Sequence, residues 1–172
     1  QLQPLDELEL IHAAEYWGKA HPQQAGVERW HLLPLHALDV AAVGVEYLRR
    51  NQRFAHWLAG RTNLTPAQLE SWIAFWLALH DLGKFAESFQ SQSLEVFQLL
   101  RKRPADPAKP YTLRHDSLGM LFWGSVLRER IVGDAWFGPQ SLDLADGLDF
   151  WARACTGHHG QPPIEGGHWG QH

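Results

Sequence analysis

The chain has 172 residues, a net charge of −4 and 45% hydrophobic residues. This length accommodates about one domain, and the composition excludes a disordered chain, a fibrous repeat and a strongly basic nucleic-acid coat protein. Eleven His, only fifteen Lys and Arg, and nine Trp stand out against this ordinary background, so the imidazoles are the feature to explain.

Helical spacing of apolar residues is the dominant pattern in the first half of the chain. It predicts helices over residues 5–18, 34–50, 52–59 and 66–82, with a loop over 21–30. The helix over 66–82 is apolar on nearly all sides, as expected of a buried central helix. Thr65 and Gln68 form a capping box at its start, and Gly83 stands where a left-handed C-terminal cap would fall.

The second half continues the pattern, with predicted helices over 85–100, 114–130 and 142–156. Prolines at 104, 107 and 110 indicate an exposed loop, and 133–140 is a further loop. No alternation with a period of two predicts a strand, and there is no internal repeat. We therefore predict an all-α fold of six or seven helices.

The sequence also bears on location. The longest uncharged apolar stretches, 72–79 and 118–127, are shorter than the roughly 18 residues that a membrane-spanning helix needs. The first ten residues carry three acids where a secretory signal would carry basic residues. The single cysteine, Cys155, allows no intrachain disulfide. These features predict a cytoplasmic protein that makes no membrane contact.

Several polar residues fall where the predicted helices begin or end. One is in the first turn of the helix over 34–50, two are in the last turn of the buried helix, one is in the first turn of the helix over 114–130, and two follow the final helix. If the helices pack side by side, these ends converge on one pocket. The residues are His36, His80, Asp81, His115, His158 and His159.

The dipeptide His80-Asp81 carries specific chemical information. Neighbouring side chains on a helix point about 100° apart, so they cannot bind one metal from a single face. A carboxylate has two oxygens and can bridge two ions roughly 3.5–4 Å apart, as in two-metal phosphoryl hydrolysis. Asp81 is the natural bridge, and the surrounding imidazoles favour Mn, Fe, Co, Ni or Zn over Mg. Such ions lower the pKa of a bound water and polarise phosphorus.

Other charged and aromatic residues offer places for DNA to bind. Lys84 follows the metal pair and is placed to contact a scissile phosphate. Two basic clusters could guide a strand or simply be solvated helix ends: Arg49, Arg50 and Arg53, and Arg101, Lys102, Arg103 and Lys109. Trp72, Trp76, Trp123 and Trp151 lie at core spacing, whereas Trp17, Trp30 and Trp169 are candidates for exposed base stacking. The remaining histidines need no special role: His12, His21, His31, His56, His168 and His172.

Taken together, these motifs resemble the HD superfamily of metal-dependent phosphohydrolases. Within it they resemble the HD nuclease domain of the type I CRISPR helicase-nuclease, particularly its subtype E members. The resemblance runs in order through nearly the whole chain, along the segments YWGK at 16–19, HLLPLHALDVAAVG at 31–44, HDLGKF at 80–85, RH at 114–115 and GHHG at 157–160.

The resemblance implies a helical bundle with the metal site at converging helix ends. It implies that His36, His80 and Asp81 bind one metal, while a second metal takes His115, His158 and His159 and shares Asp81. It further implies cleavage of single-stranded DNA after recruitment by a crRNA-guided surveillance complex, together with a superfamily 2 helicase in cis or in trans. The chain contains no Walker-type ATP-binding motif, so no ATP site is expected in it.

One departure from the family pattern concerns the first metal. The family completes that site with an aspartate well downstream of the double histidine, whereas the thirteen residues after His159 contain Glu165 but no Asp. Three explanations remain open: the chain is a fragment, Glu165 substitutes, or only the second metal binds well. We favour a fragment, with residues 1–172 forming most of an HD nuclease domain that lacks its C-terminal part and any following helicase.

Two other functions remain open on the same residues. One is an HD-type nucleotide phosphohydrolase or cyclic-nucleotide phosphodiesterase, although no base-reading residues are identifiable. The other is a non-catalytic docking module, supported only by the missing downstream Asp. The expected function is nevertheless a metal-dependent single-stranded DNA nuclease acting in antiviral CRISPR interference.

Overall fold

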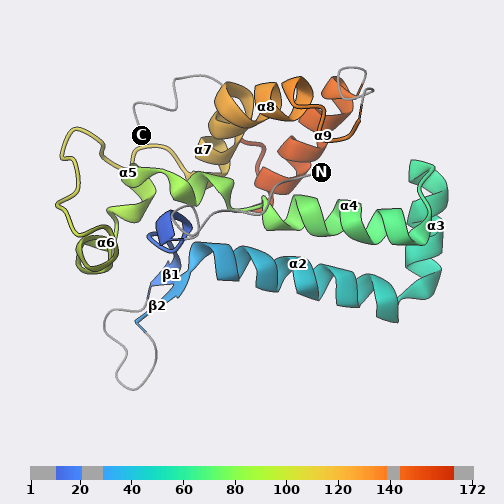
Figure 1. Cartoon of the computed structure of the whole chain (residues 1–172), viewed down its shortest axis with the longest axis horizontal. Coiled ribbons are helices and arrows are strands. Elements are labelled where there is room, and N and C mark those ends of the chain that lie inside the picture. Colours follow the sequence, from blue (N-terminus) through green and yellow to red (C-terminus); the bar gives the residue numbers. More distant parts are fainter. Residues whose placement is uncertain (1–10, 21–28, 139–143, 165–172) are drawn as a thin grey trace.

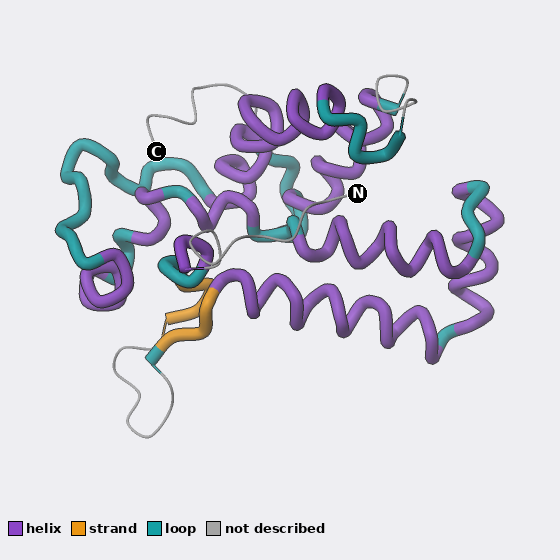
Figure 2. Tube along the Cα trace, in the orientation of Figure 1, coloured by secondary structure: helices purple, strands orange, loops and turns teal. Residues whose placement is uncertain are grey.

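A computed structural model describes residues 11–20, 29–138 and 144–164. Eight α-helices, α2 to α9, make up most of this described part, and one small two-stranded sheet accompanies them (Figure 2). The predicted all-α architecture is therefore confirmed. None of the described helices combines the length and apolar character that crossing a bilayer requires.

The first helical layer is an antiparallel pair, in which α2 (Leu33–Arg50) runs beside α4 (Pro66–Ala78). The connecting helix α3 (Gln52–Thr62) lies across their far ends (Figure 1). The predicted capping box is present at the start of α4, with the Thr65 hydroxyl accepting from the Gln68 backbone N–H. A small apolar core joins the three helices and contains Leu48, Ala55, Ala59 and Leu69.

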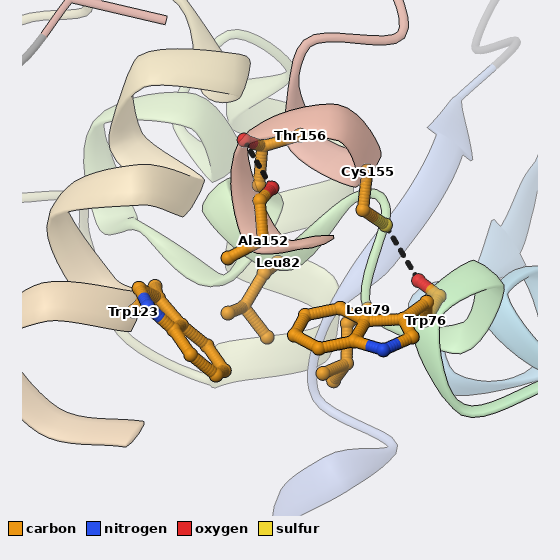
Figure 3. A pocket seen from close by; sticks show the side chains of 7 residues that line it. All are labelled: Trp76, Leu79, Leu82, Trp123, Ala152, Cys155 and Thr156. Atoms are coloured by element: carbon orange, nitrogen blue, oxygen red, sulfur yellow. Dashed lines mark hydrogen bonds between the residues drawn. The ribbon is translucent and has the colours of Figure 1, made fainter. Parts of the chain in front are cut away.

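The second layer follows α4 in the sequence. A 3-10 turn η1 (Leu82–Phe85) leads to two short helices, α5 (Glu87–Gln90) and α6 (Leu94–Arg101). Then come α7 (His115–Phe122), a π-helical turn η2 (Trp123–Leu127), α8 (Arg128–Gly133) and α9 (Ala145–Thr156). The aromatic core predicted from helical spacing is confirmed, because Trp72 and Trp151 pack against the buried Trp76 and Trp123. Trp76 and Trp123 also line a small pocket (Figure 3).

A short hairpin-like sheet was not predicted. Strand β1 (Trp17–Ala20) pairs antiparallel with β2 (Trp30–Leu32), so the predicted helix to residue 18 is wrong: only residues 11–13 are helical in its described part. Strands of four and three residues are too short to show a period of two. Trp17 is 6% exposed and packs on Phe89 in a core beneath the sheet. This burial also corrects the prediction that Trp17 is exposed for base stacking.

Three predicted helices are divided or shortened. The helix over 66–82 ends at Ala78, and His80 and Asp81 lie in the turn that follows it. The helix over 85–100 breaks at residues 91–93 into α5 and α6, and the helix over 114–130 contains the π turn η2. These breaks explain why the described residues form more helices than predicted. The helical spacing of apolar residues continues across a short break in the helix hydrogen bonds, so this spacing does not reveal the break.

Gly83 has a different role from the predicted left-handed cap. Its φ is not positive, in contrast to that of Gly160. A Cβ atom placed on Gly83 would lie 1.9 Å from the His115 carbonyl oxygen and 2.4 Å from the Gly119 nitrogen. Only a residue without a side chain therefore allows η1 to contact the backbone of α7. This contact brings the turn after α4 against the start of α7.

Substituting this glycine should destabilise the fold. We expect Gly83→Ala to lower the free energy of unfolding by about 1–3 kcal/mol or more, because rigid backbone must move to admit the methyl group. Gly60→Ala is the matched control, since a Cβ there meets nothing within 4 Å and removing a helical glycine stabilises by about 0.5–1 kcal/mol. Urea denaturation measures both. Equal stability of Gly83→Ala and the parent chain would contradict the close approach.

Candidate metal centre

All six predicted ligands come together where helices begin or end. His36 lies in the first turns of α2, and His115 is the first residue of α7. His80 and Asp81 follow α4, and His158 and His159 follow α9. Figure 1 shows α9 ending beside the end of α4, at the same end of the α2–α4 pair at which α2 begins. The structure thus brings together every residue of the predicted ligand set.

The Asp81 carboxylate is at the centre of this cluster. Its side chain is 3% exposed. Oxygen Oδ2 lies 3.0 Å from His36 Nε2 and 3.1 Å from His80 Nε2. On the other side, Oδ1 lies 3.4 Å from His115 Nε2 and 3.7 Å from His158 Nε2. One carboxylate therefore faces a different pair of imidazoles with each oxygen.

The donors fall into two groups that match the two predicted sites. His36, His80 and Asp81 form one, and His115, His158 and His159 form the other, with the potential ligand atoms of each group within 4.8 Å of one another. The Nε2 atoms of His115 and His159 are 2.9 Å apart. Such convergence of nitrogen lone pairs is the chemistry that a borderline transition-metal ion requires.

Two further observations fit a metal. Asp81 Oδ1 is fully buried without a hydrogen-bond partner in the described part of the chain, and an unsatisfied buried polar atom is costly. The Nδ1 atoms of His80 and His158 are 2.7 Å from the Leu77 carbonyl and 3.2 Å from the Cys155 carbonyl. Because a carbonyl only accepts, an Nδ1 proton can be donated to it, which orients each ring so that Nε2 would face a bound metal. This arrangement is typical of metal-binding histidines.

Electrostatics favour the metal-binding forms of His36, His158 and Asp81. Burial lowers the pKa of His36 below 6.5 despite the opposing charge of Asp81, and burial likewise lowers the pKa of His158. For Asp81, burial opposes ionisation, but the contacts with His115, His80 and Lys84 outweigh it and hold its pKa well below the usual range. Neutral imidazoles and an ionised carboxylate are the states that bind metals.

Lys84 lies inside the same cluster. Its ammonium is 2.7 Å from Asp81 Oδ2 and donates to the Gly18 carbonyl at 3.2 Å. The side chain is only 12% exposed and passes over the Phe89 ring. The predicted position beside the metal pair is therefore observed, with the cation directed at the central carboxylate.

Sequence reasoning missed a buried glutamine that supports this arrangement. Gln90 is 1% exposed. Its amide accepts from the Trp17 backbone N–H at 3.0 Å and donates to the carbonyls of Trp17 and Lys84 at 2.8 and 2.7 Å. Trp17 Nε1 donates a hydrogen bond to the Gln90 backbone carbonyl at 3.0 Å. Nothing in the local sequence distinguishes Gln90 from the exposed Gln92.

A second missed network anchors the chain after the double histidine. Asp116 is 2% exposed and accepts hydrogen bonds from the Arg114 guanidinium and from the Ser117 backbone N–H. Arg114 also reaches Gln161, and the Ser117 hydroxyl accepts from the Ile164 backbone N–H. The start of α7 therefore holds the segment that follows His159. An acid next to a predicted ligand was the only available signal.

Ion pairs neutralise four of the seven cations in the predicted basic clusters. Ion pairs join Arg49 to Glu70, Arg50 to Glu46, Arg101 to Glu15 and Arg103 to Glu87. Trp30 is only half-buried and packs against the core beneath the sheet. Trp169 and the substitute ligand Glu165 lie outside the described residues.

The Gln90 network yields a stability prediction. Gln90→Leu leaves the Trp17 amide and two carbonyls buried without partners, so we expect a loss of at least about 2 kcal/mol in unfolding free energy. Gln92→Leu, at an exposed position with one bond to the Phe89 carbonyl, should change stability by less than about 1 kcal/mol. Urea denaturation compares the two variants, and similar losses in both would contradict a special role for Gln90.

Comparison with known proteins supports the same assignment. A family model described as "Cas3, HD domain" matches residues 17–171. The CRISPR-associated endonuclease/helicase Cas3 of Escherichia coli (strain K12) is 31% identical over 159 residues, which cover 87% of this chain and 18% of that protein. The chain thus spans less than a fifth of the length of this relative, and no solved structure matches it. Because the family model covers most of the chain, including all six clustered candidate ligands, the protein belongs to the Cas3 HD-domain family.

Proposed function

We propose that this chain is a metal-dependent nuclease domain that hydrolyses phosphodiester bonds of single-stranded DNA in type I CRISPR interference. The single observation that carries the proposal is the buried Asp81 carboxylate, each of whose oxygens faces a different pair of imidazoles. Membership of the Cas3 HD-domain family supports the nuclease chemistry and the antiviral setting.

The proposed ligands follow the two clusters. One divalent transition-metal ion, Mn, Fe, Co, Ni or Zn, takes His36, His80 and Asp81, and a second takes His115, His158 and His159 with Asp81 shared between them. When bound, such ions would polarise the phosphodiester and acidify a water molecule. The nitrogen-rich donor set supports a borderline metal over Mg, which prefers oxygen ligands.

The chain's own side chains have distinct roles in this proposal. Asp81 fixes the two clusters relative to one another, because its two oxygens point to opposite sides. His80 orients its Nε2 towards the site through the bond from Nδ1 to the Leu77 carbonyl. Lys84 brings a fixed positive charge next to Asp81, where it can attract the phosphate and stabilise charge that develops on its oxygens. Asp81, His80 and Lys84 are therefore the proposed catalytic residues.

The proposed partners lie outside this chain. They are single-stranded DNA, a crRNA-guided type I surveillance complex, and a superfamily 2 helicase in cis or in trans. The helicase would supply ATP-driven movement, since this sequence holds no Walker-type motif. The E. coli relative is named as both an endonuclease and a helicase, which supports this pairing. A cytoplasmic setting is part of the same proposal.

The proposed function predicts metal-dependent cleavage. The chain should cut circular single-stranded DNA when Mn, Co or Ni is added. Asp81→Asn removes the carboxylate charge and one of its two oxygens, and His80→Ala removes an imidazole, so each should lower the rate at least about 100-fold. Asp81→Asn keeps the side-chain shape, and His56→Ala, at an exposed histidine outside the cluster, is the control that keeps full activity.

Three outcomes would redirect this assignment. Equal cleavage by the parent chain and both variants would exclude the proposed site. Hydrolysis of free nucleotides or cyclic nucleotides without DNA cleavage would favour a nucleotide phosphohydrolase. A chain that folds but binds no metal in calorimetry would instead be a docking module.

The proposed function also predicts that metal affinity depends on pH. Protons and metal ions compete for Nε2, and burial holds the pKa of His36 and His158 below 6.5. Both groups are therefore neutral above pH 6.5 and gain protons as the pH falls through their lowered values, so Mn affinity should fall with acidification below pH 6.5, by up to about tenfold per pH unit for each competing imidazole. Calorimetric titration at several pH values, with circular dichroism to verify folding, tests this. An affinity that is constant from pH 6.5 to 4.5 would contradict it.

A further inference from the structure

An exposed aromatic cluster lies far from Asp81, where α2 gives way to α3. Tyr47 and Trp57 are each 55% exposed and Phe54 is 42% exposed. Figure 1 shows α3 crossing the far ends of α2 and α4, at the edge of the molecule. Large aromatic side chains grouped on a surface mark an interaction site more often than scattered ones do.

The three rings form one continuous surface. Phe54 and Trp57 stack with centroids 5.9 Å apart and an angle of 26°, and Tyr47 meets Phe54 edge-on at 6.0 Å. The Arg61 guanidinium lies 5.2 Å from the centre of the Trp57 ring and extends the stack. We call Tyr47, Phe54, Trp57 and Arg61 the aromatic platform.

The charge around the platform is positive although the whole chain carries −4. Arg53 and Arg61 are exposed and form no ion pair with any residue that the structure describes, whereas Arg49 and Arg50 are paired with Glu70 and Glu46. Four cations against two anions leave a local charge of +2. Partly exposed aromatic rings next to guanidiniums without an ion-pair partner are typical of a surface that binds single-stranded nucleic acid.

We propose that the aromatic platform binds single-stranded DNA by base stacking, with Arg53 and Arg61 contacting the phosphates. This inference rests on the proposed function and deepens it, because it gives the substrate a second, metal-independent point of attachment. Stacking on a ring is tolerant of sequence, as a nuclease that must degrade any invading strand requires. A polyanion also fits the excess positive charge, which a purely apolar protein partner would leave uncompensated.

The position of the platform sets the length of strand involved. Tyr47 follows His36 by eleven residues of the same helix, which separates them by roughly 16 Å along the axis of α2. A strand that reaches from the platform to the metal centre therefore spans several nucleotides. Oligonucleotides that are too short to span this distance should gain nothing from the platform when they bind at the centre.

The test is DNA binding without metal. The probe is a fluorescein-labelled twenty-nucleotide oligothymidine, measured by anisotropy in EDTA, with Asp81→Asn as the parent so that no cleavage occurs. We expect Trp57→Ala and Phe54→Ala each to weaken binding at least about fivefold, the lower end for loss of one stacked base. Arg61→Gln should reduce the slope of log affinity against log salt by about 0.7, the value for one phosphate contact on a single strand.

Matched variants control for nonspecific effects. Phe150→Ala removes an aromatic ring that is 69% exposed on α9, and Arg29→Gln removes an exposed arginine that is paired with Glu95. Both should leave affinity and salt slope unchanged. Unchanged affinity in Trp57→Ala and Phe54→Ala would overturn the proposal. So would self-association of the parent chain that Trp57→Ala abolishes without any effect on DNA binding.

The outcomes separate this inference from the proposed function. Cleavage that depends on metal and Asp81, together with normal DNA affinity in the platform variants, would overturn the platform and leave the nuclease assignment intact. Stacking-dependent DNA binding by a chain that never cleaves would overturn the nuclease assignment alone.

Discussion

The buried negative charge of Asp81 is the constraint on which the rest of the structure depends. A carboxylate that is 3% exposed is costly unless charged or hydrogen-bonding groups surround it. Here the surrounding groups come from four places in the chain: the start of α2, the turn after α4, the start of α7 and the segment after α9. Satisfying one charge therefore requires four helix ends to meet, and this requirement explains why so many elements begin or end near the same point.

Helix ends can lie this close together only where glycine and polar residues take the place of large apolar side chains. Gly83 allows η1 to lie against the backbone of α7, where any side chain would collide with the His115 carbonyl. Gln90 bonds to the backbone of both Trp17 and Lys84, so the small sheet is fixed to the segment that carries the lysine. The apolar cores lie to either side and stabilise the layers. The geometry of the centre therefore comes from the close backbone contact and from the glutamine.

The residues of the candidate site were predictable because metal chemistry needs particular side chains and helical periodicity reveals where helices end. His36, His80, Asp81, His115, His158 and His159 all fell at such ends and do converge. The sheet, the breaks at residues 91–93 and the π turn were not predictable, because a few residues carry too little periodicity. The role of Gln90 was also hidden, since two of its three side-chain bonds join it to Trp17, 73 positions away. These features depend on contacts between residues that are far apart in the sequence, and local sequence patterns do not encode such contacts.

The positive charge has a different origin at the metal centre and at the aromatic platform. This difference predicts how DNA binding at each of them responds to metal removal. At the centre, Lys84 offsets Asp81, and the buried His36 and His158 favour the neutral state. Attraction for phosphate there must come mainly from bound divalent ions, which are the largest local charges in such sites. At the platform, the positive charge comes from the guanidinium groups of Arg53 and Arg61 and needs no metal. Metal removal should therefore abolish phosphate binding at the centre while the platform keeps its hold on the strand, so a chelator should stop cleavage without releasing a long oligonucleotide.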